Sequence, residues 1–133
     1  MKKYKILIVL ADFYEDISSA LLGRAKLQIP YKYAEPKNIK VIKVPGVFEI
    51  PVTISKNIKK YDAFIALGCV IKGETPHFDF ISSATTNAIM KLSVDSKKPI
   101  GNGIITCLNR NQAEDRINKA LGAVNAVISV LEQ

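Results

Sequence analysis

The sequence lacks any apolar run long enough to cross a membrane. Its longest runs, ILIVL at 6–10 and AFIAL at 63–67, fall far short of the about 20 residues that a transmembrane helix needs. The basic, apolar amino terminus is followed at once by acidic residues and has no small-residue cleavage site, so we interpret it as a first strand and not as a signal peptide. We expect a soluble, cytoplasmic protein without a membrane partner.

The chain is also poor in residues that bind metals or form disulfides. It has one histidine, His77, and two cysteines, Cys69 and Cys107. One imidazole and two separated thiols make a poor zinc site. Two cysteines without an export signal favour reduced thiols over a disulfide framework. We therefore predict no metal site.

Acidic residues are scarce beside basic ones, 12 against 19, which leaves a formal net charge of +7. The lysines occur in small scattered groups, most of which we interpret as solvated faces and helix ends. No arginine-rich helix or ribonucleoprotein aromatic pattern accompanies them, so the sequence does not favour a nucleic acid partner. A small phosphorylated substrate fits the same excess of positive charge.

The order of apolar segments predicts the fold class. Length indicates one domain over residues 1–133, and an apolar content of 48% is sufficient for a core. We predict strands at 5–10, 39–44, 62–69 and 100–107, and helices at 15–29, 49–60, 78–95 and 111–132, the last with a break near Gly122. Parallel strands require crossover connections, so this alternation predicts an α/β three-layer sandwich, a four-stranded parallel sheet with helices on both faces.

Ligands bind such sheets at the carboxyl ends of the strands, and the least common residues of this chain follow those ends. In GETPHFDF, Thr75 and Pro76 have the form of an N-cap and first helical residue, which places His77 in the first turn of a helix. A helix amino terminus attracts anions and favours a neutral imidazole that can accept a proton. A lone histidine is more often structural, but this position makes His77 a candidate general base.

The loop VPGVFEIP at 44–51 allows two interpretations. Phe48 is either a core residue or part of a ligand site. Glu49 is either a first-turn charge that offsets the helix dipole or a group that binds the polar edge of a heterocycle, with Phe13 stacked on the face of that ring. Composition alone does not decide between them.

The segments PGVFEIP, GCVIKGETPHFDF and PIGNGIIT, with a downstream arginine, resemble the signature loops of the lumazine synthase family. The resemblance extends from about residue 5 to the carboxyl end, in the family's order. It implies a flavodoxin-like fold and the condensation of 5-amino-6-(D-ribitylamino)uracil with 3,4-dihydroxy-2-butanone 4-phosphate. This is the penultimate step of riboflavin biosynthesis, and it uses no cofactor.

The resemblance also implies roles for individual residues. His77 would move protons, and Arg116, Glu74 and Thr75 would hold the phosphate of the butanone substrate. The ribitylaminouracil would be bound by Phe13, Val47, Phe48, Glu49, Cys69, Val70, Ile71 and Asn102.

Two departures from the family pattern affect these expectations. Asn102 stands where many members carry phenylalanine, which leaves Phe13 as the one aromatic side chain on the pyrimidine. The chain after Arg116 is shorter than in many members, so it is open whether Lys119 supplies a second cation to the phosphate. Together with the early first strand, the short loop implies a pentamer or a decamer, with sites shared by neighbouring subunits, and not a sixty-subunit shell.

Two other classes of protein can share this α/β skeleton. A flavodoxin-like flavin-binding protein needs a hydroxyl- and glycine-rich phosphate loop after the first strand, and ADFYEDIS at 11–18 does not have that composition. A non-catalytic assembly protein would keep the fold for its interfaces alone. The presence of His77, Glu49 and Arg116 argues against the second class.

Overall fold

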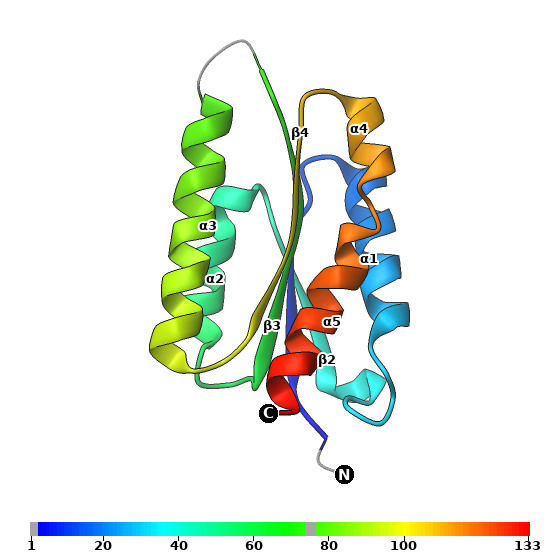
Figure 1. Cartoon of the computed structure of the whole chain (residues 1–133), viewed down its shortest axis with the longest axis vertical. Helices are drawn as coiled ribbons and strands as arrows, with labels where there is room; N and C mark the ends of the chain where they lie inside the picture. Colours follow the sequence, from blue (N-terminus) through cyan, green and yellow to red (C-terminus); the bar gives the residue numbers. More distant parts are fainter. Residues whose placement is uncertain (1–2, 74–76) are drawn as a thin grey trace.

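The computed structural model describes residues 3–73 and 77–133, and its centre is a sheet of four parallel strands (Figure 1). The strands are β1 (Ile6–Ala11), β2 (Ile39–Val44), β3 (Ala63–Ile71) and β4 (Ile100–Cys107). Their order across the sheet is β2-β1-β3-β4. All the predicted strands are present, because β-branched and apolar residues pack well on a pleated surface that is covered on both sides.

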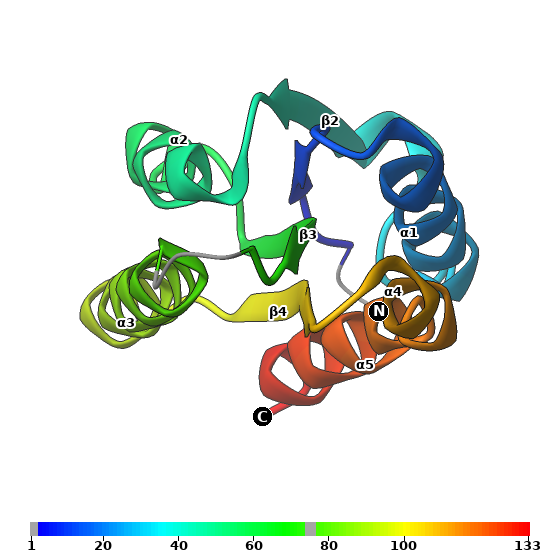
Figure 2. The same ribbon diagram turned by 90° about the horizontal axis from the view of Figure 1, so that it is seen from above.

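Helices cover both faces of the sheet and complete three layers (Figure 2). They are α1 (Glu15–Gln28), α2 (Ile50–Asn57), α3 (His77–Ser96), α4 (Arg110–Asp115) and α5 (Lys119–Leu131), with short 3-10 turns η1 (Pro36–Asn38) and η2 (Val47–Glu49). α1, α4 and α5 lie on one face, and α2 and α3 lie on the other. The predicted α/β sandwich is confirmed. None of the described helices is long and apolar enough to cross a membrane.

Strand β1 shows why its sequence is an unbroken apolar run. All of its residues are buried. Ile6, Ile8 and Leu10 join the apolar cluster under α1 and α5, whereas the residues between them join the cluster under α2 and α3. Each fully buried side chain of this size stabilises the fold by roughly 1.5–3 kcal/mol relative to exposure.

The order of the strands fixes where a ligand can bind. The chain goes from β1 to β2 on one side and later to β3 on the other side of β1. The connections that follow β1 and β3 therefore diverge at the carboxyl edge of the sheet, which is the upper edge in Figure 1. A divergence of this kind opens a crevice outside the strand ends, where α/β sheets bind their ligands.

The carboxyl-terminal segment differs from the prediction. One helix over 111–132 with a break near Gly122 is wrong: the segment forms α4 and α5, separated by residues 116–118. The N–H of Arg116 donates to the carbonyl of Ala113, three residues back, at 3.1 Å, which tightens the end of α4. Gly122 lies within α5, and a Cβ built there would have no neighbour within 4 Å. The glycine is tolerated on an open helix face and does not end the helix.

Candidate active site

A cavity of about 540 Å³ opens at the carboxyl edge of the sheet, and we call it the His77 cavity. Its lining comes from the segments that follow β1 and β2, from the end of β3 and from the start of α3. The lining residues are Phe13, Tyr14, Pro45, Gly46, Val47, Phe48, Glu49, Cys69, Val70, Ile71, His77 and Ile81. A volume between about 300 and 1,000 Å³ with few polar groups in an apolar wall is typical of small-molecule sites. The cavity is large enough for a substituted heterocycle.

Two aromatic rings stand at this cavity in contact with solvent. Phe13 is 71% exposed and Phe48 is 62% exposed. The interpretation of Phe48 as a core residue is therefore wrong, because the 3-10 turn η2 directs it away from the core that Val47 joins. Exposed rings at a cavity can stack on a flat ligand without a change in the core.

Glu49 closes the loop between β2 and α2. Its Oε1 accepts a hydrogen bond from the Gly46 N–H at 2.9 Å, and its carbonyl accepts one from the Thr53 hydroxyl at 2.8 Å. Among the described residues only Oε1 of this carboxylate is engaged, so Oε2 can still accept a hydrogen bond from a ligand. Glu49 thus has a structural role in shaping the loop and retains one oxygen that a ligand can use.

Strand β3 forms the floor of the cavity. Gly68 lies so close to η2 that a Cβ there would be 2.7 Å from Cγ1 of Val47, so only glycine fits without a shift. Cys69 follows it and is buried. Burial, with a smaller contribution from the neighbouring Cys107, raises the pKa of the Cys69 thiol to about 12. Because the thiolate is the nucleophilic form, Cys69 contributes shape to the floor and not reactivity.

His77 is the first residue of α3, and its exposed side chain lines the cavity. Imidazole is the side chain that most often serves as a general acid and base in enzymes, so His77 is the candidate in this lining for accepting and returning a proton. Glu74 and Thr75, together with the predicted cap at Pro76, lie outside the described residues.

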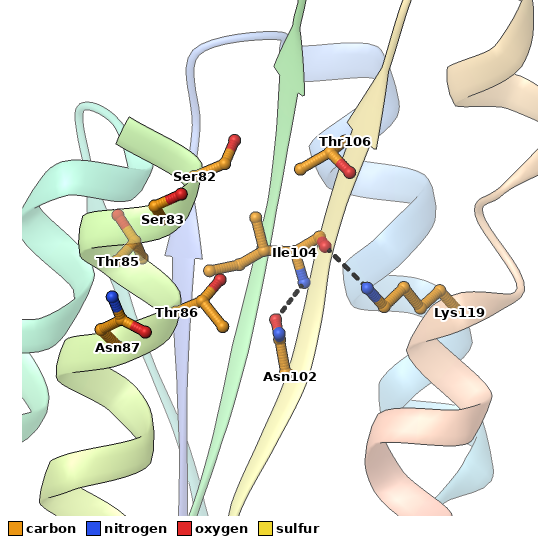
Figure 3. Close-up of a pocket in the computed structure, with 9 residues that line it drawn as sticks. All are labelled: Ser82, Ser83, Thr85, Thr86, Asn87, Asn102, Ile104, Thr106 and Lys119. Carbon is orange, nitrogen blue, oxygen red and sulfur yellow. Dashed lines mark hydrogen bonds between the residues drawn. The ribbon is translucent and has the colours of Figure 1, made fainter. Parts of the chain in front are cut away.

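Asn102 and Arg116 do not line the His77 cavity. They line two smaller cavities along the free edge of β4, which we call the β4-edge cavities. The first, of about 340 Å³, is lined by Ser82, Ser83, Thr85, Thr86, Asn87, Asn102, Ile104, Thr106 and Lys119 (Figure 3). The second, of about 430 Å³, is lined by Ile105, Thr106, Asp115, Arg116, Asn118 and Lys119. The predicted site residues therefore fall into two groups on one chain.

The side chains of the second group bind the backbone at the free edge of β4. Oδ1 of Asn102 accepts from the Ile104 N–H at 3.1 Å, and Nζ of Lys119 donates to the Ile104 carbonyl at 3.1 Å, as the dashed lines in Figure 3 show. Nη1 of Arg116 donates to the Thr106 carbonyl. A guanidinium has five N–H donors and an ammonium has three, so both cations keep donors for an anion.

The His77 cavity and the β4-edge cavities differ in their electrostatic character. Arg116 and Lys119 place two positive charges beside the second β4-edge cavity, which suits a phosphate. The His77 cavity offers an apolar wall, one imidazole and one carboxylate. In residues 3–73 and 77–133 there is no group of three or more histidines, cysteines and carboxylates that could hold a metal.

Sequence reasoning did not assign four of the residues that line the His77 cavity, namely Tyr14, Pro45, Gly46 and Ile81. Tyr14 lines it beside Phe13, and Ile81 lines it four residues after His77. The helical spacing of His77 and Ile81 is a signal that could have identified Ile81, because residues four apart lie on the same face of a helix. Tyr14 had no such signal, since it directly precedes α1 and its direction depends on packing.

Comparisons with known proteins identify the same family over almost the whole chain. A model of the family described as 6,7-dimethyl-8-ribityllumazine synthase matches residues 3–133. The chain is similar to the 6,7-dimethyl-8-ribityllumazine synthase of Polaromonas sp. (strain JS666 / ATCC BAA-500), with 39% identity over 97% of this chain and 86% of that protein. It is 41% identical to the enzyme of that name from Corynebacterium kroppenstedtii, over 84% of this chain and 69% of the relative. It is 42% identical to the enzyme of that name from Agrobacterium fabrum, over 90% of this chain and 84% of the relative.

Proposed function

The chain belongs to the 6,7-dimethyl-8-ribityllumazine synthase family, and from this premise we propose how its residues share the family's reaction. The protein is a transferase of riboflavin biosynthesis that condenses 5-amino-6-(D-ribitylamino)uracil with 3,4-dihydroxy-2-butanone 4-phosphate to 6,7-dimethyl-8-ribityllumazine. The observation that carries the assignment of roles is the His77 cavity, where one imidazole, one carboxylate and two exposed rings meet. A flavin carrier or a non-catalytic assembly protein is not favoured.

The direct test mixes the purified protein with both substrates and follows the fluorescence of the lumazine. We expect product only when both substrates are present, with one inorganic phosphate released for each lumazine formed. Flavin binding with reversible reduction, and no lumazine, would contradict the function. Omission of either substrate is the control.

The pyrimidine substrate is assigned to the His77 cavity. Phe13 stacks on its ring, and residues 47–49 hold the ring and the ribityl chain, with Oε2 of Glu49 as an acceptor for a hydroxyl. The floor residues Cys69, Val70 and Ile71 border the same ligand. The size and apolar wall of the cavity support this assignment. Asn102 faces the pyrimidine from a neighbouring subunit, and its engaged Oδ1 leaves the NH₂ group as the part that meets the ligand.

His77 is the proton-transfer residue. Imine formation, phosphate elimination and ring closure each need a proton moved at a nitrogen, carbon or oxygen of the substrates. A positioned imidazole accelerates such steps by typically 10²- to 10⁴-fold, and the juxtaposition of two substrates supplies the rest.

The butanone phosphate is assigned to Arg116 together with Glu74 and Thr75, which lie outside the described residues. The guanidinium is oriented by the Thr106 carbonyl and keeps free donors for two phosphate oxygens. The neighbouring charge of Lys119 favours the same anion.

Because Arg116 and Asn102 line cavities other than that of His77, a complete site requires a second chain. We propose a homo-oligomer, a pentamer or a decamer, in which the His77 cavity of one subunit meets the β4 edge of its neighbour. Three exposed apolar residues on one face of α3, Phe80, Met90 and Val94, support a contact between copies. Light scattering should give five or ten times 14.7 kDa, and a monomer or a megadalton particle would contradict the proposal.

Two further assignments complete the proposal. Residues 1–133 form one domain, which should unfold in a single cooperative transition. The protein acts in the cytoplasm, in line with two buried, unpaired cysteines. Fractionation of the source cells tests the second assignment.

A further inference from the structure

Phe13, to which we assign the pyrimidine ring, has little contact with its own chain. Its side chain is 71% exposed, and its one described ring contact is with Tyr14. The two rings meet edge to face, with centroids 4.9 Å apart and an angle of 80° between their planes. Without this contact an exposed phenylalanine samples several rotamers, and each ligand would have to select one of them.

Tyr14 is held from two sides and can serve as a fixed support. Its ring is partly buried and packs on the apolar cluster under α1 and α5. The guanidinium of Arg110, the first residue of α4, lies 5.9 Å from the centroid of the same ring, within the range of a cation–π contact. Arg110 in turn pairs with the carboxylate of Asp16 in the first turn of α1.

The start of α4 is itself fixed, so Arg110 is not at the end of a loose loop. The side chain of Asn109 accepts from the Gln112 N–H at 3.0 Å and caps the helix. The Gln112 side chain accepts from the Leu108 N–H at 2.8 Å. This reciprocal arrangement fixes the backbone on both sides of Arg110.

From these contacts we infer that Tyr14 is a positioning residue, which holds the ring of Phe13 in the orientation that stacks on the pyrimidine, with Arg110 as its outer support. The inference rests on the proposed stacking role of Phe13. A ring that is already oriented loses less conformational freedom when the ligand binds, so the benefit appears in affinity for the pyrimidine and not in the chemical step. Tyr14 acts through Phe13 and takes no part in proton transfer.

The first test replaces Tyr14 by leucine. Tyr14→Leu should raise KM for the ribitylaminouracil by roughly 2- to 10-fold, the equivalent of one aromatic pair, and leave kcat and KM for the butanone phosphate near wild type. The conservative variant Tyr14→Phe keeps the ring and should keep the low KM. Arg110→Leu should raise the same KM by about 2-fold, because a partly exposed cation–π contact is weak. It removes an exposed side chain, so it tests the inference even if Tyr14→Leu fails to fold.

Tyr61 provides a matched control. It is also a partly buried tyrosine in an edge-on contact with a phenylalanine, Phe64, at 6.1 Å, but it lies just before β3 at the opposite edge of the sheet. Tyr61→Leu should lower the melting temperature and leave both KM values unchanged. An equal rise of the pyrimidine KM in Tyr61→Leu would mean that general destabilisation explains the effect, and would overturn the inference.

A double-mutant cycle separates the inference from the proposed function. Phe13→Ala alone should raise the pyrimidine KM, and Tyr14→Leu should add nothing to it in the Phe13→Ala background. If Tyr14→Leu has its full effect without Phe13, then Tyr14 does not act through Phe13 and the inference is wrong, whereas the stacking role of Phe13 survives. If Phe13→Ala itself leaves KM unchanged, the stacking role is wrong and the inference falls with it.

Discussion

The His77 cavity and the β4 edge use their polar groups in opposite ways. In the cavity, few side chains are polar, and one carboxylate oxygen of Glu49 is hydrogen-bonded to the backbone of its own loop. At the β4 edge most lining residues are polar, and Asn102, Arg116 and Lys119 are all bonded to the strand backbone. In the function that we propose, the cavity provides shape and a proton-transfer residue, and the edge provides oriented charge. Neither region has all the groups that we assign to a condensation with loss of phosphate, and this is the basis for proposing that a second chain completes the site.

The largest effect is expected where the cavity loses its proton carrier. His77→Ala should lower kcat by about 10- to 10³-fold, because positioned general acid–base groups contribute at that scale. The pyrimidine KM should change little, since the aromatic and backbone contacts are retained. Steady-state kinetics with both substrates saturating provide the measurement. Unchanged turnover under those conditions would refute the role of His77 and weaken the contrast between the two regions.

A smaller, selective effect is expected where the edge loses its oriented charge. Arg116→Ala should raise KM for the butanone phosphate by roughly 10-fold or more and weaken inhibition by inorganic phosphate, with the pyrimidine KM retained. Arg116→Lys should rescue only in part, because an ammonium lacks the planar fork.

The control for this variant is Lys91→Ala, which removes an exposed cation paired with Asp95 on α3. It should leave both KM values unchanged, since an isolated surface ion pair contributes little. Equal loss of affinity for both substrates in Arg116→Ala would mean that this arginine is structural.

Mixing the two variants tests whether the regions complete each other across subunits. In a cyclic head-to-tail oligomer with random mixing, His77→Ala and Arg116→Ala subunits regenerate an intact pair of regions at about a quarter of the interfaces. Activity after co-expression should therefore reach about a quarter of wild type, well above either variant alone. Mass spectrometry must confirm mixed rings, and mixed rings without recovered activity would rule out the shared site.

The last effect is absent at neutral pH and concerns the floor of the cavity. Burial raises the pKa of the Cys69 thiol from its ordinary value of 9.0 to about 12, so the native protein binds a proton that the unfolded chain releases. The stabilisation is complete below pH 9 and is lost as the pH rises toward 12. The free energy of unfolding should fall over that interval, and less so in Cys69→Ala. Alkylation of Cys69 at pH 8 should be slow in the native protein and rapid in urea, whereas rapid native labelling would contradict the burial.

The sequence was a good guide to the elements and a poor guide to their contacts. The strands and the position of His77 at the start of α3 follow from local patterns, namely apolar runs and cap residues. The exposure of Phe48 and the break at residues 116–118 do not, because each depends on a single turn whose direction is set by tertiary packing. For the same reason no local pattern could show that Tyr14 packs against Phe13. The separation of Arg116 from the His77 cavity was expected only from the family resemblance, which implies sites shared by neighbouring subunits.

The bonds between side chains and backbone along β4 have a consequence beyond catalysis. An unpaired strand edge is a template on which another chain can add a strand, which leads to aggregation. In this protein the N–H and C=O of Ile104 and the C=O of Thr106 are already occupied by Asn102, Lys119 and Arg116. Loss of these side chains would uncover backbone groups at the edge, so substitutions here should reduce both the substrate binding that we propose for them and the resistance to aggregation.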